Sequence, residues 1–139
     1  MDSELIPLTF NKVMQSKSYT VFILGTEEKQ FAIYTNPHVG QNIQTYLTEK
    51  DYPRPLTHDM MQFIFEGFGI ELLQIVINDV QDTVYYACLY LKQQIKDESK
   101  ILEIDTRPSD CLPLALISNI PIYCKKEILH KIVPLSEKI

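Results

Sequence analysis

The hydrophobic and polar positions along the chain change their period several times, which predicts a mixture of strands and helices. Runs that alternate or are continuously apolar, and are rich in β-branched and aromatic residues, are typical of strands. Seven strands are expected, at residues 5–13, 18–24, 30–35, 71–78, 84–91, 101–105 and 121–124. Residues 78–82 and 93–100 are expected to be polar connections between the later strands.

Other stretches have helical spacing. Asn36 is a preferred helix cap and Pro37 suits the first helical position, so a helix is expected from Pro37 to about Glu49. A second helix has Thr57 as its N-cap and Gly69 as a left-handed cap beyond its end. We expect its apolar stripe to pack in the core. The stripe consists of Met60, Met61, Phe63, Ile64, Phe65 and Phe68.

A third main helix opens at Arg107-Pro108 and reaches about Ser118. Pro113 lies five residues after Pro108 and removes an early helical hydrogen bond, so a kink or a shortened helix is expected. A short amphipathic helix is expected at residues 125–131.

The two halves of the chain resemble each other in the order of their elements, three strands followed by a helix. At an offset of 71 residues, Ile33, Thr35 and Pro37 fall on the identical residues Ile104, Thr106 and Pro108. This predicts a duplicated three-strand-plus-helix unit, with the Thr57 helix as the bridge. Because sequential strands joined by short turns pair antiparallel, the expected fold is α+β. It would be one domain over residues 1–139, with a core at about 5–130 and two mostly antiparallel sheets packed around helices.

Composition and charge exclude some classes of function. The chain has 13 Lys and Arg against 18 Asp and Glu, a formal net charge of -5, which argues against a protein that coats nucleic acid through a basic face. The three cysteines, Cys88, Cys111 and Cys124, have no CxxC spacing and stand among apolar residues, which favours buried reduced thiols and a cytoplasmic location. No signal peptide is expected, and no apolar run approaches the ~18 residues that cross a bilayer, so no membrane partner is expected.

The start of the third helix is a candidate anion site. Arg107 is a poor N-cap, so local structure gives no reason for it there. An Arg and the Ser109 hydroxyl beside unpaired helix N–H groups would form an anion pocket. The alternative is that Arg107 pairs with Asp105 or Asp110 and only fastens the turn.

The start of the second helix carries Thr57-His58-Asp59. The positive end of a helix disfavours a charged imidazole, so His58 could act as a general base that Asp59 or Thr57 orients. The alternative is a histidine whose hydrogen bonds only fix the turn.

Four aspartates could supply oxygen ligands for Mg²⁺ or Mn²⁺, namely Asp79, Asp82, Asp105 and Asp110. Asp79 and Asp82 also fit ordinary turn chemistry in a hairpin connection.

Three segments resemble the bifunctional nuclease domain family. They are RPLTHDMMQFIFEGFG at residues 54–69, VINDVQD at 76–82 and LEIDTRPSDCLPLALISNIPIYCKKEIL at 102–129. The resemblance implies a compact, self-associating α+β domain with nuclease activity on DNA and RNA. The residues carried over to this chain are His58, Asp59, Asp105, Arg107, Ser109 and Asp110. As hypotheses from their chemistry, His58, Asp59 and Asp110 would be catalytic, Arg107, Ser109 and Thr57 would bind phosphate, and Asp105 and Asp110 are candidate ligands of a divalent cation.

The sequence departs from the family pattern at three places, one of which is Pro113, where small helix formers are usual. The first helix reads His38-Val39-Gly40 after its Pro, where acids are usual, and Thr83 stands where Gly is typical.

The sequence as a whole leaves two functional hypotheses. The first is a nuclease that cleaves DNA or RNA, with single-stranded nucleic acid as partner. The second is a non-catalytic module that binds an anion or small ligand, or associates with a second copy of itself.

Overall fold

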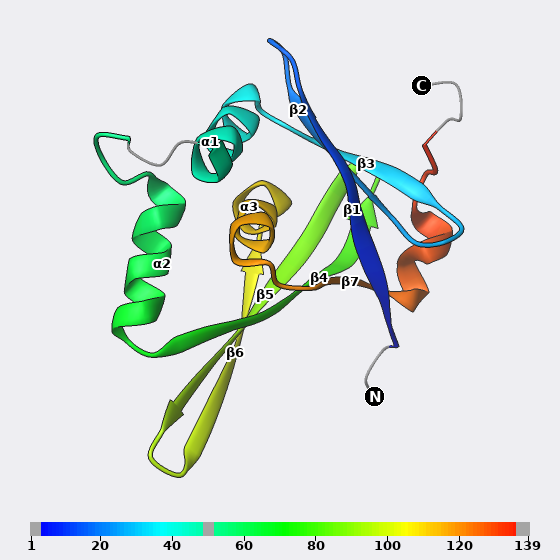
Figure 1. Ribbon diagram of the computed structural model, residues 1–139. Helices are drawn as coiled ribbons and strands as arrows, with labels where there is room; N and C mark the ends of the chain where they lie inside the picture. The colour runs from blue at the N-terminus through cyan, green and yellow to red at the C-terminus, as the bar shows by residue number, and fades with distance from the viewer. Residues whose placement is uncertain (1–3, 49–51, 136–139) are drawn as a thin grey trace.

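The computed structural model describes residues 4–48 and 52–135 (Figure 1). All of the expected strands and helices occur. The elements in chain order are β1 (Leu5–Gln15), β2 (Thr20–Gly25), β3 (Gln30–Thr35), α1 (Pro37–Thr48), α2 (Thr57–Gly67), β4 (Ile70–Gln81), β5 (Val84–Ile95), β6 (Glu98–Thr106), α3 (Pro108–Ser118), β7 (Ile122–Lys125) and the 3₁₀ helix η1 (Lys126–Lys131).

The later strands are longer than expected. Most of residues 78–82 and 93–100 continue the strands, which two-residue turns at Asp82-Thr83 and Lys96-Asp97 connect. The first residue of each turn has a positive φ, 58° for Asp82 and 55° for Lys96. The expectation of polar loops was therefore wrong, because polar side chains at the solvent-facing positions of a hairpin do not interrupt its pairing.

The local signals at the helix ends are largely confirmed. The Asn36 Oδ1 atom accepts a hydrogen bond of 3.0 Å from His38 N–H, and Gly69 has a φ of 65° just beyond α2. The expected end of the first helix at Glu49 lies outside the described residues. Thr57 is not the N-cap of α2, since Leu56 holds that position and Thr57 is the first helical residue.

The strands form one sheet in the order β3-β2-β1-β7-β4-β5-β6, in which every pair is antiparallel except β4 with β7. The α+β class and the mostly antiparallel pairing are confirmed. The two expected sheets are joined into one, because β1 pairs with β7 through Leu5–Leu8 and with β2 through Thr9–Gln15. Each half has three strands and then a helix; the internal duplication stays a prediction.

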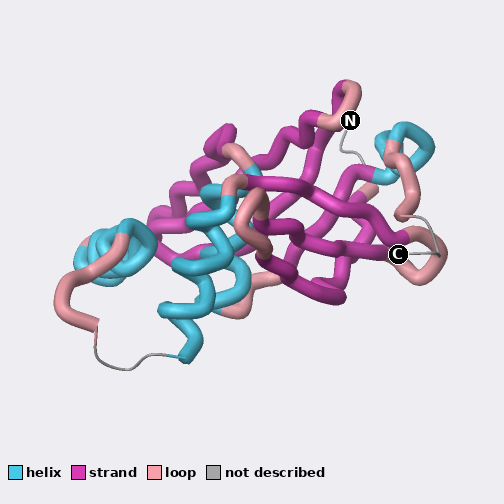
Figure 2. Tube along the Cα trace, turned by 90° about the horizontal axis from the view of Figure 1, so that it is seen from above, coloured by secondary structure: helices cyan, strands magenta, loops and turns pink. Residues whose placement is uncertain are grey.

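The sheet curls until its two ends approach each other. The rings of Phe31 on β3 and Tyr85 on β5 stack with centroids 5.3 Å apart, although four strands separate β3 from β5 in the sheet. Viewed from above, α1, α2 and α3 lie toward one end of the molecule and η1 lies at the other end (Figure 2). The core packs α3 against residues from both halves, including Phe22 and Ile75.

The three helices differ in how they meet this core. Six residues of α3 are buried, and the helix continues through the buried Pro113 to Ser118, so the expected shortening does not occur. Burial of the α2 stripe was also expected and is wrong for most of it. Met61 and Phe65 pack against the core, but the remaining members are exposed. Within the described residues, no helix has the length and apolar character that crossing a membrane requires.

Candidate functional site

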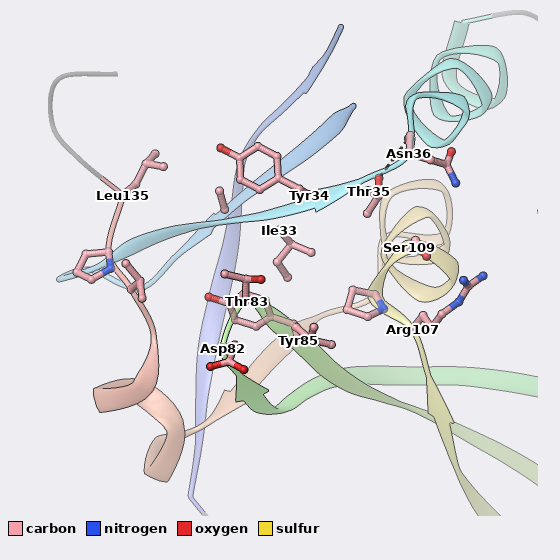
Figure 3. Close-up of a pocket in the computed structure, with 15 residues that line it drawn as sticks. Ile33, Tyr34, Thr35, Asn36, Asp82, Thr83, Tyr85, Arg107, Ser109 and Leu135 are labelled. Carbon is pink, nitrogen blue, oxygen red and sulfur yellow. Dashed lines mark hydrogen bonds between the residues drawn. The ribbon is translucent and has the colours of Figure 1, made fainter. Parts of the chain in front are cut away.

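A cavity of about 850 Å³ opens where the ends of the curled sheet meet the start of α3 (Figure 3). Four segments that are distant in sequence line it, at residues 32–36, 82–85, 107–109 and 133–135. The first is the edge strand β3, the second the β4–β5 turn and the third the start of α3. The last segment is tied to β3 by a hydrogen bond of 2.6 Å from Leu135 N–H to the Gln30 carbonyl oxygen.

The first turn of α3 leaves one residue with free donors. Arg107 is the N-cap, in extended backbone, and its carbonyl oxygen accepts hydrogen bonds from Asp110 N–H and Cys111 N–H at 2.9 and 3.2 Å. Pro108 has no N–H. Neither the N–H nor the hydroxyl of Ser109 donates to any residue within 4–48 or 52–135, and Ser109 lines the cavity. Ser109 therefore presents two donors at the positive end of a helix, where an anion is stabilised.

Arg107 stands at the rim of this cavity. Its Nε atom lies 3.1 Å from Asp110 Oδ2, so the structure contains the ion pair that the sequence had left as the alternative to an anion site. In Figure 3 the guanidinium points away from Tyr34 and Leu135. Both partners are largely exposed, and such surface pairs contribute only about 0–1 kcal/mol, so a phosphate can compete for the guanidinium.

His58 lies behind the start of α3 and is buried. Its Nε2 atom is 2.7 Å from the Asp110 carbonyl oxygen, and its Nδ1 atom is 3.2 Å from the Tyr46 hydroxyl. Because a carbonyl only accepts, the network assigns the ring hydrogen to Nε2, and the Tyr46 hydroxyl donates to Nδ1. The same hydroxyl accepts from His58 N–H at 3.0 Å. His58 thus connects α1, α2 and α3, and it does not line the cavity.

Asp59 and Thr57 are also separate from the cavity. Both carboxylate oxygens of Asp59 lie 2.7 Å from the Tyr52 hydroxyl, and one accepts from Leu56 N–H at 2.8 Å. These bonds fix the start of α2. The hydrogen bond to Asp59 raises the pKa of Tyr52 to about 12. Thr57 is exposed in the first turn.

The four aspartates do not assemble into a metal site. Asp79 lies in β4, not in the turn, and pairs with Lys131 at 3.1 Å; this hydrogen bond is the main cause that lowers the pKa of Asp79. Asp82 occupies the turn and lines the cavity, while Asp105 is exposed on β6. Among the described residues, no group of three or more His, Cys, Asp or Glu side chains could hold a metal ion. A divalent cation held by Asp105 and Asp110 stays a prediction, and we derive no step through one.

The structure brings together only some of the residues that the sequence singled out. Arg107, Ser109 and Asp110 meet at the start of α3, whereas His58 and Asp59 serve the packing of the helices. Sequence reasoning missed the aromatic side of the cavity. Tyr34 is exposed there and Tyr85 is half-buried, and burial raises the pKa of Tyr85. The alternation in QFAIYT could have placed Tyr34 on an exposed face, but no local pattern marks its distant neighbours.

Comparison with known proteins gives one match that covers most of the chain. Residues 22–134 match the family described as the bifunctional nuclease domain.

Relatives match a shorter part of the chain. The uncharacterized proteins MT1877 and Rv1829, from two strains of Mycobacterium tuberculosis, are each 35% identical over 77 residues, which is 55% of this chain and 43% of theirs. Bifunctional nuclease 1 of Oryza sativa subsp. indica is 27% identical over 78 residues, which is 56% of this chain and 23% of that protein. The matched segment spans less than half of each relative.

Proposed function

Because the chain belongs to the bifunctional nuclease domain family, we propose that it hydrolyses phosphodiester bonds of DNA or RNA at the start of α3. The observation that carries this proposal is the family match itself, since residues 22–134 contain the lining of the cavity except Leu135. Free donors on Ser109 and an exposed guanidinium beside them support a site for the phosphate.

The proposed reaction begins with an exchange of partners. A phosphate bound by the Ser109 N–H and hydroxyl would draw the Arg107 guanidinium from Asp110, which costs little because that pair is exposed. The freed Asp110 carboxylate would then accept a proton from the attacking water, whose oxygen bonds to phosphorus as the P–O bond to the leaving sugar oxygen breaks. The proton would pass from Asp110 to that leaving oxygen. Arg107 would stabilise the charge that develops on the phosphate oxygens.

His58 has a positioning role in this proposal. Both of its ring nitrogens are engaged inside the protein, and its bond to the Asp110 carbonyl oxygen holds the backbone of the first turn of α3. The exposed ring of Tyr34 offers a face on which a base could stack.

The net charge restricts the partner to a local contact. Because the protein has a formal net charge of -5, it offers a long duplex no general electrostatic attraction. A single-stranded segment or end is therefore the proposed substrate. The proposal places the activity in the cytoplasm, which the three buried free cysteines support.

The test is cleavage of labelled single-stranded DNA and RNA, with and without EDTA. Wild type is compared with Arg107→Ala, Ser109→Ala and Asp110→Asn, with Arg54→Ala as the matched control, since Arg54 is exposed and does not line the cavity. We expect cleavage to fall about 100-fold or more in the three site variants and to stay unchanged in the control. Equal cleavage by all five folded proteins would show a contaminant or another site.

A second candidate function is a non-catalytic module that binds a phosphate-containing ligand. The observation that favours it is the engagement of His58 and Asp59, which leaves the cavity without a free imidazole. Saturable binding of a dinucleotide that depends on Arg107 and Ser109, without turnover at any metal concentration, would select this function over the nuclease.

A further inference from the structure

One side of α2 carries a stripe of large apolar side chains that the described structure leaves exposed. Met60 is 54% exposed, Phe63 60%, Ile64 47% and Phe68 69%. Their spacing of three and four residues places them along one side of the helix. On the other side, His58 is buried, and Met61 and Phe65 pack against the core. We call Met60, Phe63, Ile64 and Phe68 the outer α2 stripe.

The outer α2 stripe is large enough to form the centre of a dimer interface. Taking about 200 Å² for a fully exposed large apolar residue, the four side chains present roughly 450 Å². Two copies together would cover roughly 900 Å² of these side chains. Homodimer interfaces are about 65% apolar, so the complete interface would bury roughly 1,400 Å², inside the 1,200–2,000 Å² range of stable complexes.

Gly67 indicates what covers the stripe. It is the last residue of α2, and a Cβ built there would meet no atom within 4 Å. The described residues of this chain therefore give no steric reason for a glycine, although glycine in a helix costs about 1 kcal/mol relative to alanine. Gly67 lies seven residues after Met60, so both project to the same side of the helix.

A second copy would make use of this arrangement. In an antiparallel, two-fold contact between two α2 helices centred between Phe63 and Ile64, Met60 of one copy falls opposite Gly67 of the other. The bulky residue at one end of the stripe would fill the space that the small residue leaves at the other end. The stripe itself carries no charge, and the acidic residues of α2, Asp59 and Glu66, are outside it. Recognition would therefore be apolar.

We propose that the outer α2 stripe is a self-association surface, on which α2 of one copy packs antiparallel against α2 of a second copy. This dimer would leave the proposed nuclease site open, because no residue of α2 lines the cavity. It is independent of whether the site cleaves nucleic acid.

The test is the oligomeric state, measured by sedimentation equilibrium over a range of protein concentrations. We expect wild type to be a dimer and Phe63→Asp to be a monomer with an unchanged circular dichroism spectrum. Val133→Asp is the matched control, because Val133 is 71% exposed and follows η1, which lies on the opposite side of the molecule from α2 (Figure 1). The control should remain a dimer.

A second variant tests the register of the two helices. Gly67→Leu has open space in the monomer, so it should fold, but its side chain would occupy the place of Met60 of the second copy. We expect the dissociation constant of the dimer to rise about tenfold or more. A wild-type protein that stays monomeric at the highest concentration would overturn the proposal, as would a Phe63→Asp variant that remains a dimer. An unchanged dissociation constant for Gly67→Leu would overturn the antiparallel register.

Discussion

Helices α2 and α3 have the same length of 11 residues and similar numbers of apolar side chains, yet they are held in opposite ways. The α3 helix lies inside the curl of the sheet and buries six residues: Pro108, Cys111, Leu112, Pro113, Leu114 and Ala115. The α2 helix buries only His58. Apolar packing therefore holds α3, whereas hydrogen bonds made by His58 and Asp59 hold the start of α2.

This difference suits the two helices to different roles, α3 to stabilising the fold and α2 to contacting another molecule. A helix that is surrounded by core contacts has no side left for a partner, but it can present its N-terminus as a rigid site. A helix that is held at one end by polar contacts can leave an apolar side for another molecule. The structure places the candidate anion site on the first kind of helix and the proposed self-association surface on the second.

The largest expected effect comes from truncating matched side chains on the two helices. Leu114→Ala in α3 should lower the free energy of unfolding by about 2–5 kcal/mol, because the side chain is fully buried and leaves a cavity. Phe63→Ala in α2 should cost less than about 0.5 kcal/mol in the monomer. Urea unfolding at decreasing protein concentration measures both. Equal losses at the lowest concentration would contradict the distinction between the helices.

The next effect tests the hydrogen bonds that hold α2 against α3. His58→Ala removes the acceptor of the Tyr46 hydroxyl hydrogen and the side-chain donor to the Asp110 carbonyl oxygen, which should cost about 1–3 kcal/mol, while the bond from the backbone N–H of residue 58 to Tyr46 can remain. Hydrogen exchange of the first turn of α3 should also accelerate. His38→Ala is the matched control, because His38 is exposed in the first turn of α1. If both variants had the same stability, the bonds of His58 would contribute nothing.

A smaller effect concerns the start of α2 at high pH. The bond from Tyr52 to Asp59 raises the pKa of Tyr52 in the folded state from 10.0 to about 12. A group with a raised folded pKa stabilises the fold fully below its unfolded pKa and loses this contribution as pH rises through the folded value. Wild type should therefore lose stability between pH 10 and about 12 through this group.

Tyr52→Phe should lack that part of the loss. Melting temperatures across this pH range compare wild type, Tyr52→Phe and the control Tyr86→Phe, which removes an exposed hydroxyl on β5. If the melting temperatures of wild type and Tyr52→Phe decreased in parallel over this pH range, the bond from Tyr52 to Asp59 would not be the cause of the loss.

The smallest expected effect on stability is at the candidate site. Arg107→Ala removes an exposed ion pair and should change the free energy of unfolding by less than about 1 kcal/mol, while phosphate binding weakens. Thermal unfolding with and without inorganic phosphate separates the two quantities, with Arg54→Ala as control. A large loss of stability without phosphate would mean that Arg107 serves the fold of α3.

These contrasts also show what the sequence could predict. The Asn36 cap and the left-handed Gly69 were correct because capping depends on neighbouring residues. The stripe of α2 was placed in the core wrongly, because a period of 3.6 residues shows that a helix has an apolar side but not what covers it.

The candidate site was predictable only where it is local. Arg107, Ser109 and Asp110 are within four consecutive residues, so the sequence alone could propose them as one group. The partners of His58 are 12 and 52 residues away in the chain, and the cavity joins four separate segments. Such neighbours are set by the curl of the sheet, which no local pattern encodes.

The place of β7 has a consequence for how the chain folds. This strand of four residues, Ile122–Lys125, inserts between β1 and β4 and so links the two halves of the sheet. Its partner Leu5 lies at the opposite end of the described chain. During synthesis, the first half can pair β1 with β2 and β2 with β3, but the sheet cannot close until residue 125 has left the ribosome. Contacts this distant in sequence slow folding, so closure by β7 is expected to be a late, rate-limiting step.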